Sequence, residues 1–432
     1  MKRILIICPY FPPSNTADMQ RVRMSLPYFK DLDWNVEVVI VDEKYSDVVK
    51  DPLLLESIPS DIVIHKVSAL SKKWTSKFGL GSLGLRSMWF YKQKVNRLLK
   101  SKKFDLIYFS TTEFPICVLG NHWSRKFGIP YVIDMQDPWH SDYYKNKPKA
   151  ERPKKYWFSY RLHKYLEPIA MRKVNGLISV STKYIQVLHT RYPLLKKKPS
   201  ATITFGAFDL DFEIADKHKE NLKLAYPQQE GYVNLVYVGR GGYDMQDAIN
   251  ILFESFKKGI KERPELFNNV HLHFIGTSYA PKGKGKETIS TLAHNFDISN
   301  YVTEYTDRIG FYESIKNLKQ ADGLIIIGSN DVGYTASKLY PYILTNKPLL
   351  ALFHKESSAA KIIKECNAGD LITLDQSIQI AYPILSQYIE KVNRKTAPLT
   401  NWQAFEPYTA AHLTKQQINL FNQVIDASSK AI

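Results

Sequence analysis

One pattern limits the possible folds of this chain more than any other: short apolar runs alternate with helix-length segments, and the alternation occurs twice. Runs rich in Val and Ile, such as RILIICPY, VEVVIVD and FDLIYFS, are separated by longer segments that mix apolar and charged residues. Apolar runs of about four to eight residues predict buried strands. Helices between such strands predict a parallel sheet that is covered on both faces.

The alternation starts again after a polar link, FEIADKHKENLKLAYPQQEG. The strand-like runs VNLVYVG, VHLHFIG and GLIIIGS follow, separated by further helix-length segments. A chain of 432 residues is also too long for one compact core and suits two domains. The sequence therefore predicts two tandem Rossmann-like α/β domains with doubly wound parallel sheets, at residues 1–210 and 211–404. A final amphipathic helix, within residues 405–432, can pack back on the first domain.

The composition favours a protein of a reducing compartment. With 44% hydrophobic residues, both domains can bury a core. No run has the roughly 18 uncharged apolar residues that span a bilayer, and MKRILIICPYFPP lacks the length of a signal peptide. The three cysteines form neither a CxxC pair nor a disulfide framework. We expect a cytoplasmic protein with no structural metal and no cofactor.

The net charge of +17 lies entirely within residues 1–210. Residues 66–103 hold many bases and no acid, with tryptophans, phenylalanines and leucines between them, and the stretch KNKPKAERPKKYWFSYRLHKY repeats the mixture. This mixture predicts peripheral attachment to an anionic membrane surface through residues 66–103, on the inner face of the cytoplasmic membrane. The alternative is a solvated basic face over an ordinary core. Nucleic-acid binding is not expected, because zinc-finger spacings and RNP-like aromatic motifs are missing.

Candidate site residues are expected in the loops that follow strands, because ligands of doubly wound sheets bind where the strands end. In the first domain, the loop YFPPSNTADMQRVR leads into a helix that carries two arginines, and YVIDMQDPWH ends a buried strand with several polar and aromatic residues. These loops supply six candidates, which are Arg21, Arg23, Asp134, Asp137, Trp139 and His140. The alternatives are arginines that face solvent, a helix cap at Asp137 and a core-rim tryptophan at Trp139.

In the second domain, two loops have features of phosphate binding. VGRGGYDMQDA places Arg240 among Gly239, Gly241 and Gly242, where a backbone free of side chains and a forked cation suit a phosphate. The loop GSNDVGYTASK leads into a helix whose first N–H groups, with Lys338, can form an anion site. The alternative for the second loop is a capped structural helix. A third loop, IGTSYAPKGKGK, carries lysines that we expect to be solvated.

In their order, these segments resemble the GT-B-fold glycosyltransferases, specifically the bacterial members of glycosyltransferase family 4. The resemblance covers nearly the whole chain. It depends on the FPP loop, FGIPYVIDMQDPWH, VYVGRGG and SKLYPYILTNKPLLAL, which is similar to the donor-site helix of the family. The resemblance implies two domains with an interdomain cleft, where residues 1–210 bind the acceptor and residues 211–404 bind a nucleotide-sugar.

The resemblance also implies an activity: transfer of a hexose or related sugar from a nucleotide-sugar to a glycan or polyprenyl-diphosphate-linked acceptor, in cell-surface polysaccharide synthesis. The reaction is expected to be retaining and metal-independent, with Arg240, Lys338 and Asp137 as catalytic residues. The other first-domain candidates would then bind the acceptor. The donor-binding set is Gly239, Gly241, Gly242, Asp331, Gly333, Tyr334, Thr335 and Ser337.

The chain departs from the family pattern at the donor site. Pro341 stands where the family usually has the glutamate that holds the ribose, and Gly333 stands where its partner acid is found, although Asp331 lies near enough to substitute. The lysine that usually follows the arginine of VGRGG is also absent. These departures support an alternative, in which the chain is a catalytically degenerate GT-B scaffold or partner protein at the membrane.

Overall fold

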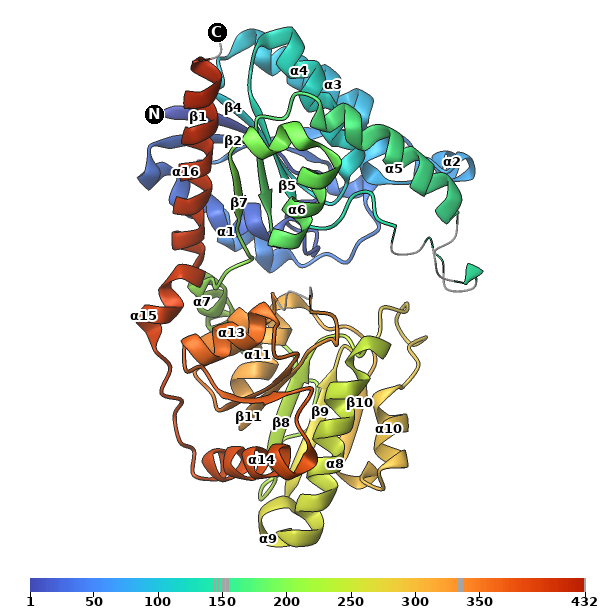
Figure 1. Cartoon of the computed structure of the whole chain (residues 1–432), viewed down its shortest axis with the longest axis vertical. Coiled ribbons are helices and arrows are strands. Elements are labelled where there is room, and N and C mark those ends of the chain that lie inside the picture. The colour runs from blue at the N-terminus through green and yellow to red at the C-terminus, as the bar shows by residue number, and fades with distance from the viewer. Residues whose placement is uncertain (143–144, 146–147, 150–151, 153–154, 333–336, 431–432) are drawn as a thin grey trace. The chain divides into compact units, whose positions relative to one another are not determined.

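The computed structural model describes the chain except for residues 143–144, 146–147, 150–151, 153–154, 333–336 and 431–432 (Figure 1). The chain forms two compact units. Unit 1 contains residues 1–206 together with residues 410–432, and unit 2 contains residues 207–409. The boundary predicted at residue 210 therefore lies at residues 206 and 207, and the second unit extends to residue 409 rather than 404.

Unit 1 is built on a sheet of seven parallel strands in the order β3-β2-β1-β4-β5-β6-β7. The central strands β4 and β5 are buried along their length, and the last four residues of β1 are buried as well, as their apolar sequences predict. The strands are β1 (Lys2–Ile7), β2 (Trp34–Val41), β3 (Val63–Val67), β4 (Leu106–Ser110), β5 (Tyr131–Met135), β6 (Gly176–Ser179) and β7 (Ser200–Thr202). The helices used below are α1 (Gln20–Phe29), α2 (Lys72–Thr75), the 3₁₀ turn η4 (Ser76–Phe78), α3 (Leu83–Ser101), α4 (Val118–Phe127), α5 (Tyr156–Met171), α6 (Thr182–Arg191) and α16 (Ala410–Ser429).

The C-terminal helix α16 belongs to unit 1 and lies along its sheet (Figure 1). Its Phe421 packs edge-on against Trp34, with ring centroids 5.9 Å apart, and against Tyr108 at 5.0 Å. The amide of Gln417 donates a 2.8 Å hydrogen bond to the Ser25 hydroxyl of α1. The last helix thus returns to the domain in which the chain begins, as the sequence allowed.

Unit 2 has a sheet of six parallel strands in the order β10-β9-β8-β11-β12-β13. The strands are β8 (Val233–Val238), β9 (Val270–Ile275), β10 (Val302–Tyr305), β11 (Gly323–Ile327), β12 (Leu349–Phe353) and β13 (Asp370–Thr373). The helices are α7 (Asp209–Lys217), α8 (Gln246–Glu262), α9 (Pro264–Phe267), α10 (Ile289–Asn295), α11 (Phe311–Gln320), α12 (Leu339–Leu344), α13 (Ser358–Glu365), α14 (Ile378–Asn393) and α15 (Trp402–Phe405).

The predicted fold class, two parallel doubly wound α/β domains, is confirmed by these sheets. The sequence did not predict β10 or β13, the two edge strands of unit 2. Each has only four residues, and both are partly exposed, so neither produces a long apolar run. Among the described residues, no helix is long and apolar enough to cross a membrane.

Candidate functional site

The loop that follows β8 approaches the side chain of Lys338, at the start of α12, most closely at its first glycine. A Cβ atom on Gly239 would lie 1.9 Å from Nζ of Lys338 and 2.7 Å from the hydroxyl of Tyr237. The backbone N–H groups of Gly239 and Gly241 donate to the carbonyls of Ile275 and Thr277, each at 2.8 Å, which holds the loop beside the end of β9. The predicted glycines therefore bring the backbone of β8 against a lysine about a hundred residues away in sequence.

Lys338 occupies an electropositive and largely dehydrated position. Its Nζ donates a 2.8 Å hydrogen bond to the Tyr237 hydroxyl and lies 4.7 Å from the centre of that ring. Although the side chain as a whole is only half-buried, desolvation of the ammonium, and then the charges of Arg240 and Arg308, lower the pKa of Lys338 to about 7. Near neutral pH the side chain is therefore partly a neutral amine, and this amine is poised to gain a proton when an anion binds beside it.

The guanidinium of Arg240 is held in a defined orientation by Asp244. Two parallel hydrogen bonds of 2.7 Å join the two side chains, and hydrogen bonding to Arg240 lowers the pKa of Asp244 to about 2. A Cβ atom on Gly242 would lie 2.1 Å from the Arg240 guanidinium, so a larger residue there would displace this side chain from its present position. The Arg240 side chain keeps 27% of its surface exposed, and its partner keeps 34%.

A pocket of about 450 Å³ opens beside this arginine, within unit 2. Its volume is in the range of small-ligand sites. Three cationic side chains line it, and the Arg308 guanidinium lies 4.7 Å from the ring of another lining residue, Tyr279. The described lining residues are Arg240, Gly241, Gly242, Thr277, Ser278, Tyr279, Ala280, Lys284, Lys286 and Thr288.

One wall of this pocket, residues 277–288, was not among the predicted site residues. The sequence suggested solvated lysines in this loop, because Lys284 stands between two glycines, Lys286 stands between a glycine and a glutamate, and neither has an apolar neighbour. The pairing of β8 with β9 brings this loop to the side of Arg240. One feature of the sequence could have indicated this wall: the loops after β8 and β9 follow consecutive strands of the predicted parallel sheet, so they could be expected to lie side by side.

The start of α10 lies at the same end of the sheet but already has an anion of its own. Glu304 accepts hydrogen bonds from the backbone N–H groups of Ile289 and Ser290 at 2.8 Å, and from the Thr277 hydroxyl at 2.6 Å. The partial positive charge of this helix end is therefore neutralised. An anionic ligand in the pocket would find its cations at Arg240 and the two lysines of the wall.

The predicted donor loop between β11 and α12 is described only at its two ends. Asp331 and Ser337 are exposed, and the Asp331 N–H donates to the Ser329 hydroxyl at 3.1 Å. Gly333, Tyr334 and Thr335 lie outside the described residues. Pro341 lies in α12, next to Tyr342, whose hydroxyl accepts a 2.6 Å hydrogen bond from the N–H of Val238 and so fastens α12 to the end of β8.

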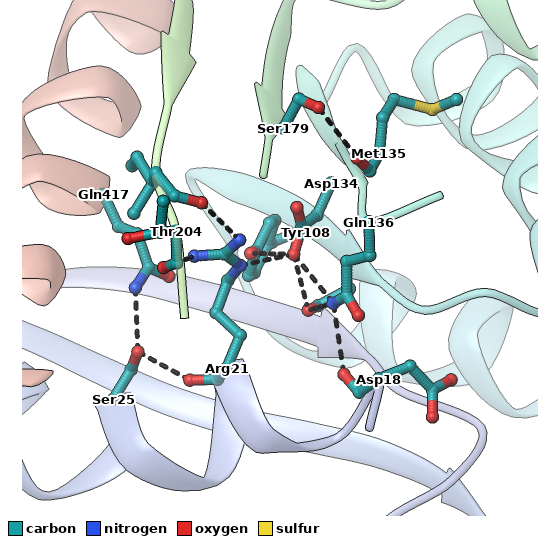
Figure 2. A network of polar contacts seen from close by, with 12 residues as sticks. Asp18, Arg21, Ser25, Tyr108, Asp134, Met135, Gln136, Ser179, Thr204 and Gln417 are labelled. Carbon is teal, nitrogen blue, oxygen red and sulfur yellow. Dashed lines mark hydrogen bonds and ion pairs between the residues drawn. The ribbon is translucent and has the colours of Figure 1, made fainter. Parts of the chain in front are cut away.

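In unit 1, two of the predicted acceptor residues form a buried ion pair with each other (Figure 2). Nε of Arg21 lies 2.6 Å from a carboxylate oxygen of Asp134, and the rest of the guanidinium donates to the carbonyls of Ile203, at 2.7 Å, and Thr204, at 3.1 Å. The same carboxylate oxygen accepts further hydrogen bonds from Tyr108, Ser110 and Gln136. The pair thus ties α1 to the ends of β4, β5 and β7.

Burial corrects the acceptor-binding prediction for these side chains and for Arg23. Arg21 is 2% exposed, while Asp134 and Arg23 are 0% exposed. Arg23 donates to the Gln20 side chain at 2.8 Å and to the Ser57 hydroxyl at 3.1 Å. Arginines at a helix start usually face solvent, but here the loops of unit 1 cover them, so all three side chains hold the domain together instead of presenting charge at its surface.

The remaining first-domain candidates have different environments. Asp137 is exposed on one side, yet desolvation by the surrounding protein, and then the charge of Asp18, raise the pKa of its carboxyl. Trp139 is buried and stacks on Phe114, with ring centroids 5.5 Å apart. The His140 ring packs against Tyr160 at 4.8 Å, and burial lowers its pKa. Asp137 is therefore the most accessible carboxylate of the YVIDMQDPWH segment, whereas Trp139 serves the core.

Comparisons with known proteins identify the fold. Neither protein-family models nor curated protein sequences give a match. Among solved structures, HepE of Anabaena, in complex with UDP and glucose, is 16% identical with a TM-score of 0.56, over 98% of this chain and all of that one. A mutant of S. aureus TarM, in complex with fondaparinux, α-GlcNAc-glycerol and UDP, is 12% identical with a TM-score of 0.58, over 98% of this chain and all of that one. A UDP-forming trehalose-phosphate synthase from Burkholderia xenovorans is 10% identical with a TM-score of 0.58, over 98% of this chain and 99% of that one.

The chain has the GT-B fold. At these identities the similarity concerns the fold, and the chemistry of this chain has to be argued from its own residues.

Proposed function

We propose that this chain is a glycosyltransferase that uses a nucleotide-sugar, whose diphosphate binds beside Arg240 and Lys338. The observation that carries the proposal is the convergence of these two cations behind the glycine loop of β8, next to an open pocket lined by two further lysines. The carboxyl ends of parallel strands are the usual ligand-binding edge of doubly wound sheets. The GT-B fold is consistent with this substrate class.

The proposed chemistry follows from the charges of the pocket. The bond between the sugar carbon and the diphosphate oxygen breaks, and a bond from that carbon to the acceptor hydroxyl forms. Negative charge then builds up on the leaving diphosphate, where Arg240 and protonated Lys338 stabilise it. We propose Asp137 as the group that accepts the hydroxyl proton, because its raised pKa suits a base that must be ionised and still bind a proton.

We propose a retaining, metal-independent transfer, in which the cations of the pocket take the place of a metal at the diphosphate. The acceptor is proposed to be a glycan or polyprenyl-diphosphate-linked sugar, in cell-surface polysaccharide synthesis. The protein would then work on the cytoplasmic side of the membrane, attached peripherally through residues 66–103. Uridine diphosphate is the first ligand to test, because the HepE and TarM structures contain UDP.

The test is a comparison of nucleotides on the intact protein, followed by an activity assay. UDP, GDP, ADP and CDP are each added in a thermal-shift titration, and one of them should raise the melting temperature more than the others. The matching nucleotide-sugar is then offered with lipid-linked acceptors, and release of the nucleoside diphosphate is measured. Arg240→Ala should abolish the transfer while the fold is retained. Near-normal turnover in that variant would remove the arginine from the mechanism.

A second candidate function is a catalytically silent GT-B partner protein. Two observations favour it: Pro341 replaces the glutamate expected from the resemblance, and the Arg240 guanidinium is already paired with the Asp244 carboxylate. A silent partner should not be stabilised by any of the four nucleoside diphosphates. The thermal-shift titration therefore separates the two functions before any acceptor is known.

A further inference from the structure

Unit 1 exposes several large aromatic side chains close to basic residues. Trp74 is 65% exposed, Phe78 is 73% exposed and Trp157 is 64% exposed. Single exposed hydrophobic residues are common on soluble proteins and need no explanation, but a contiguous group of them indicates an interaction surface. Trp74 and Phe78 belong to α2 and η4, whereas Trp157 lies at the start of α5.

These two segments are about eighty residues apart in sequence, yet they lie side by side. The ammonium of Lys155 donates a 2.8 Å hydrogen bond to the carbonyl of Ser76. The ring of Phe158 lies against the backbone of Gly79, where a Cβ atom would come within 2.7 Å of it. Figure 1 shows α2 beside the first turns of α5. We call residues 72–80 and 155–161, taken together, the basic aromatic tip.

The cations of the tip are arranged around its rings. Nζ of Lys77 lies 4.9 Å from the Trp74 ring, and the guanidinium of Arg161 lies 5.5 Å from the Trp157 ring. The tip itself contains no acidic residue. Lys72 has an acidic partner outside the tip, Asp47 at 2.8 Å, and both members of that pair are largely exposed. Such a pair contributes little and can be exchanged for another anion.

The basic aromatic tip includes only part of residues 66–103, the segment that the sequence predicted to attach to a membrane. Most of residues 83–103 belong to α3, whose apolar side chains are largely used in the core: Leu83, Tyr91 and Val95 are buried. The start of α5, which lies outside residues 66–103, supplies the second half of the exposed surface. The candidate surface is therefore formed by residues 72–80 together with residues 155–161, and not by residues 66–103 alone.

We propose that the basic aromatic tip docks on an anionic lipid bilayer. Its exposed rings would enter the headgroup boundary, while the lysines and arginines around them meet anionic headgroups. The charge of the tip favours a lipid bilayer as its partner, because a surface with several cations and no acid is complementary to a membrane surface that carries anionic headgroups. The docking rests on the proposed function only for its purpose, since a lipid-linked acceptor would be found in the membrane. The docking itself does not depend on sugar transfer.

The test is sedimentation of the full-length protein with lipid vesicles at low salt. Phosphatidylcholine vesicles and mixed phosphatidylcholine–phosphatidylglycerol vesicles are compared, and binding is expected to the mixed vesicles. Replacing both Lys73 and Lys77 by Gln should lower the partition coefficient by about 25-fold, at about five-fold for each charge near an anionic surface. The triple variant Trp74→Ser, Phe78→Ser, Trp157→Ser should lower it about ten-fold or more, because its rings no longer enter the boundary.

Matched controls use residues of similar exposure outside the tip. Leu194→Ser (80% exposed) and Trp402→Ser (45% exposed) should bind vesicles like the wild type. The charge control is Lys219→Gln with Lys361→Gln. Circular dichroism and the nucleotide thermal shift should be unchanged in all variants, so that loss of docking is distinguished from misfolding and from failure of the proposed function.

Three results would overturn the docking proposal. The first is wild-type protein that stays in the supernatant with mixed vesicles at low salt. The second is binding that the tip variants share equally with their controls. The third is binding to duplex DNA or RNA that exceeds vesicle binding and is lost in the same variants, since the tip would then be a nucleic-acid surface.

Discussion

Each unit carries an arginine shortly after its first strand, and the two arginines are used in opposite ways. Arg21 follows β1 and is 2% exposed, with its charge paired to Asp134 and its remaining N–H groups directed at backbone carbonyls. Arg240 follows β8 and is 27% exposed beside an open pocket, although it too is paired with an aspartate. Both arginines follow the first strand of their unit, Arg21 in helix α1 and Arg240 in the loop directly after β8, and both are paired with an aspartate.

The difference shows that the surroundings of such a pair, rather than the pair itself, decide what it can do. A buried ion pair cannot exchange partners, because separating it would leave two desolvated charges. A part-exposed pair remains in contact with water, so an incoming phosphate can replace the carboxylate at little cost. On this comparison, Arg21 is a structural residue of unit 1, and Arg240 is available to a ligand.

The largest expected effect is on the stability of unit 1. Arg21→Ala leaves Asp134 as an unpaired buried charge, so the free energy of unfolding should fall by about 3–5 kcal/mol. Urea denaturation followed by circular dichroism measures this change. Arg21→Met combined with Asp134→Leu removes both charges and should recover most of the loss. A loss below about 1 kcal/mol in the single variant would show that the pair is not the structural element described here.

The same change at Arg240 should affect binding rather than stability. In Arg240→Ala, loss of a charge-assisted bidentate contact to a phosphate should weaken binding of the preferred nucleoside diphosphate by about 100-fold, measured by calorimetry. The free energy of unfolding should change by less than about 1 kcal/mol, because the pair with Asp244 is part-exposed. If the variant unfolds as readily as Arg21→Ala, the contrast between the two arginines is lost.

The pH dependence of binding should report the protonation of Lys338. Its pKa is about 7 in the free protein, and a bound diphosphate raises the pKa because it favours the ammonium. Binding therefore takes up a proton above pH 7, and affinity should fall by about ten-fold between pH 6 and pH 8. Calorimetry in buffers of different ionisation enthalpy measures this uptake. Lys338→Gln should bind more weakly and lose the dependence, and an unchanged pH profile in that variant would assign the proton to another group.

The smallest expected effect concerns the attachment of α16. Gln417→Ala removes the buried hydrogen bond to Ser25, and the free energy of unfolding of unit 1 should fall by about 1 kcal/mol. Asn419→Ala, on the exposed face of the same helix, is the matched control and should change stability by less than half as much. Equal effects of the two substitutions would indicate that helix propensity, not the hydrogen bond, is being measured.

The contrast between the two arginines was only partly visible in the sequence. VGRGG and YVIDMQDPWH were both found as polar exits of buried strands, and both positions are confirmed by the sheets. Burial was not predictable for Arg21, because the carbonyls that saturate its guanidinium come from Ile203 and Thr204, more than 180 residues further along the chain. The pocket wall at residues 277–288 was missed for a related reason, since strand order places it beside Arg240.

The alternation of apolar runs and amphipathic segments by itself determined the two doubly wound domains, because strand and helix periodicities are local properties that appear in any window of the sequence. The same local signals located the loops that follow the buried strands. Only the tertiary structure decided which arginine is buried, how Lys338 comes to lie against Gly239 and where α5 meets η4. Each of these depends on contacts with distant segments, and the degree of burial that these segments impose decides whether a residue becomes part of a buried structural pair or stays accessible to solvent.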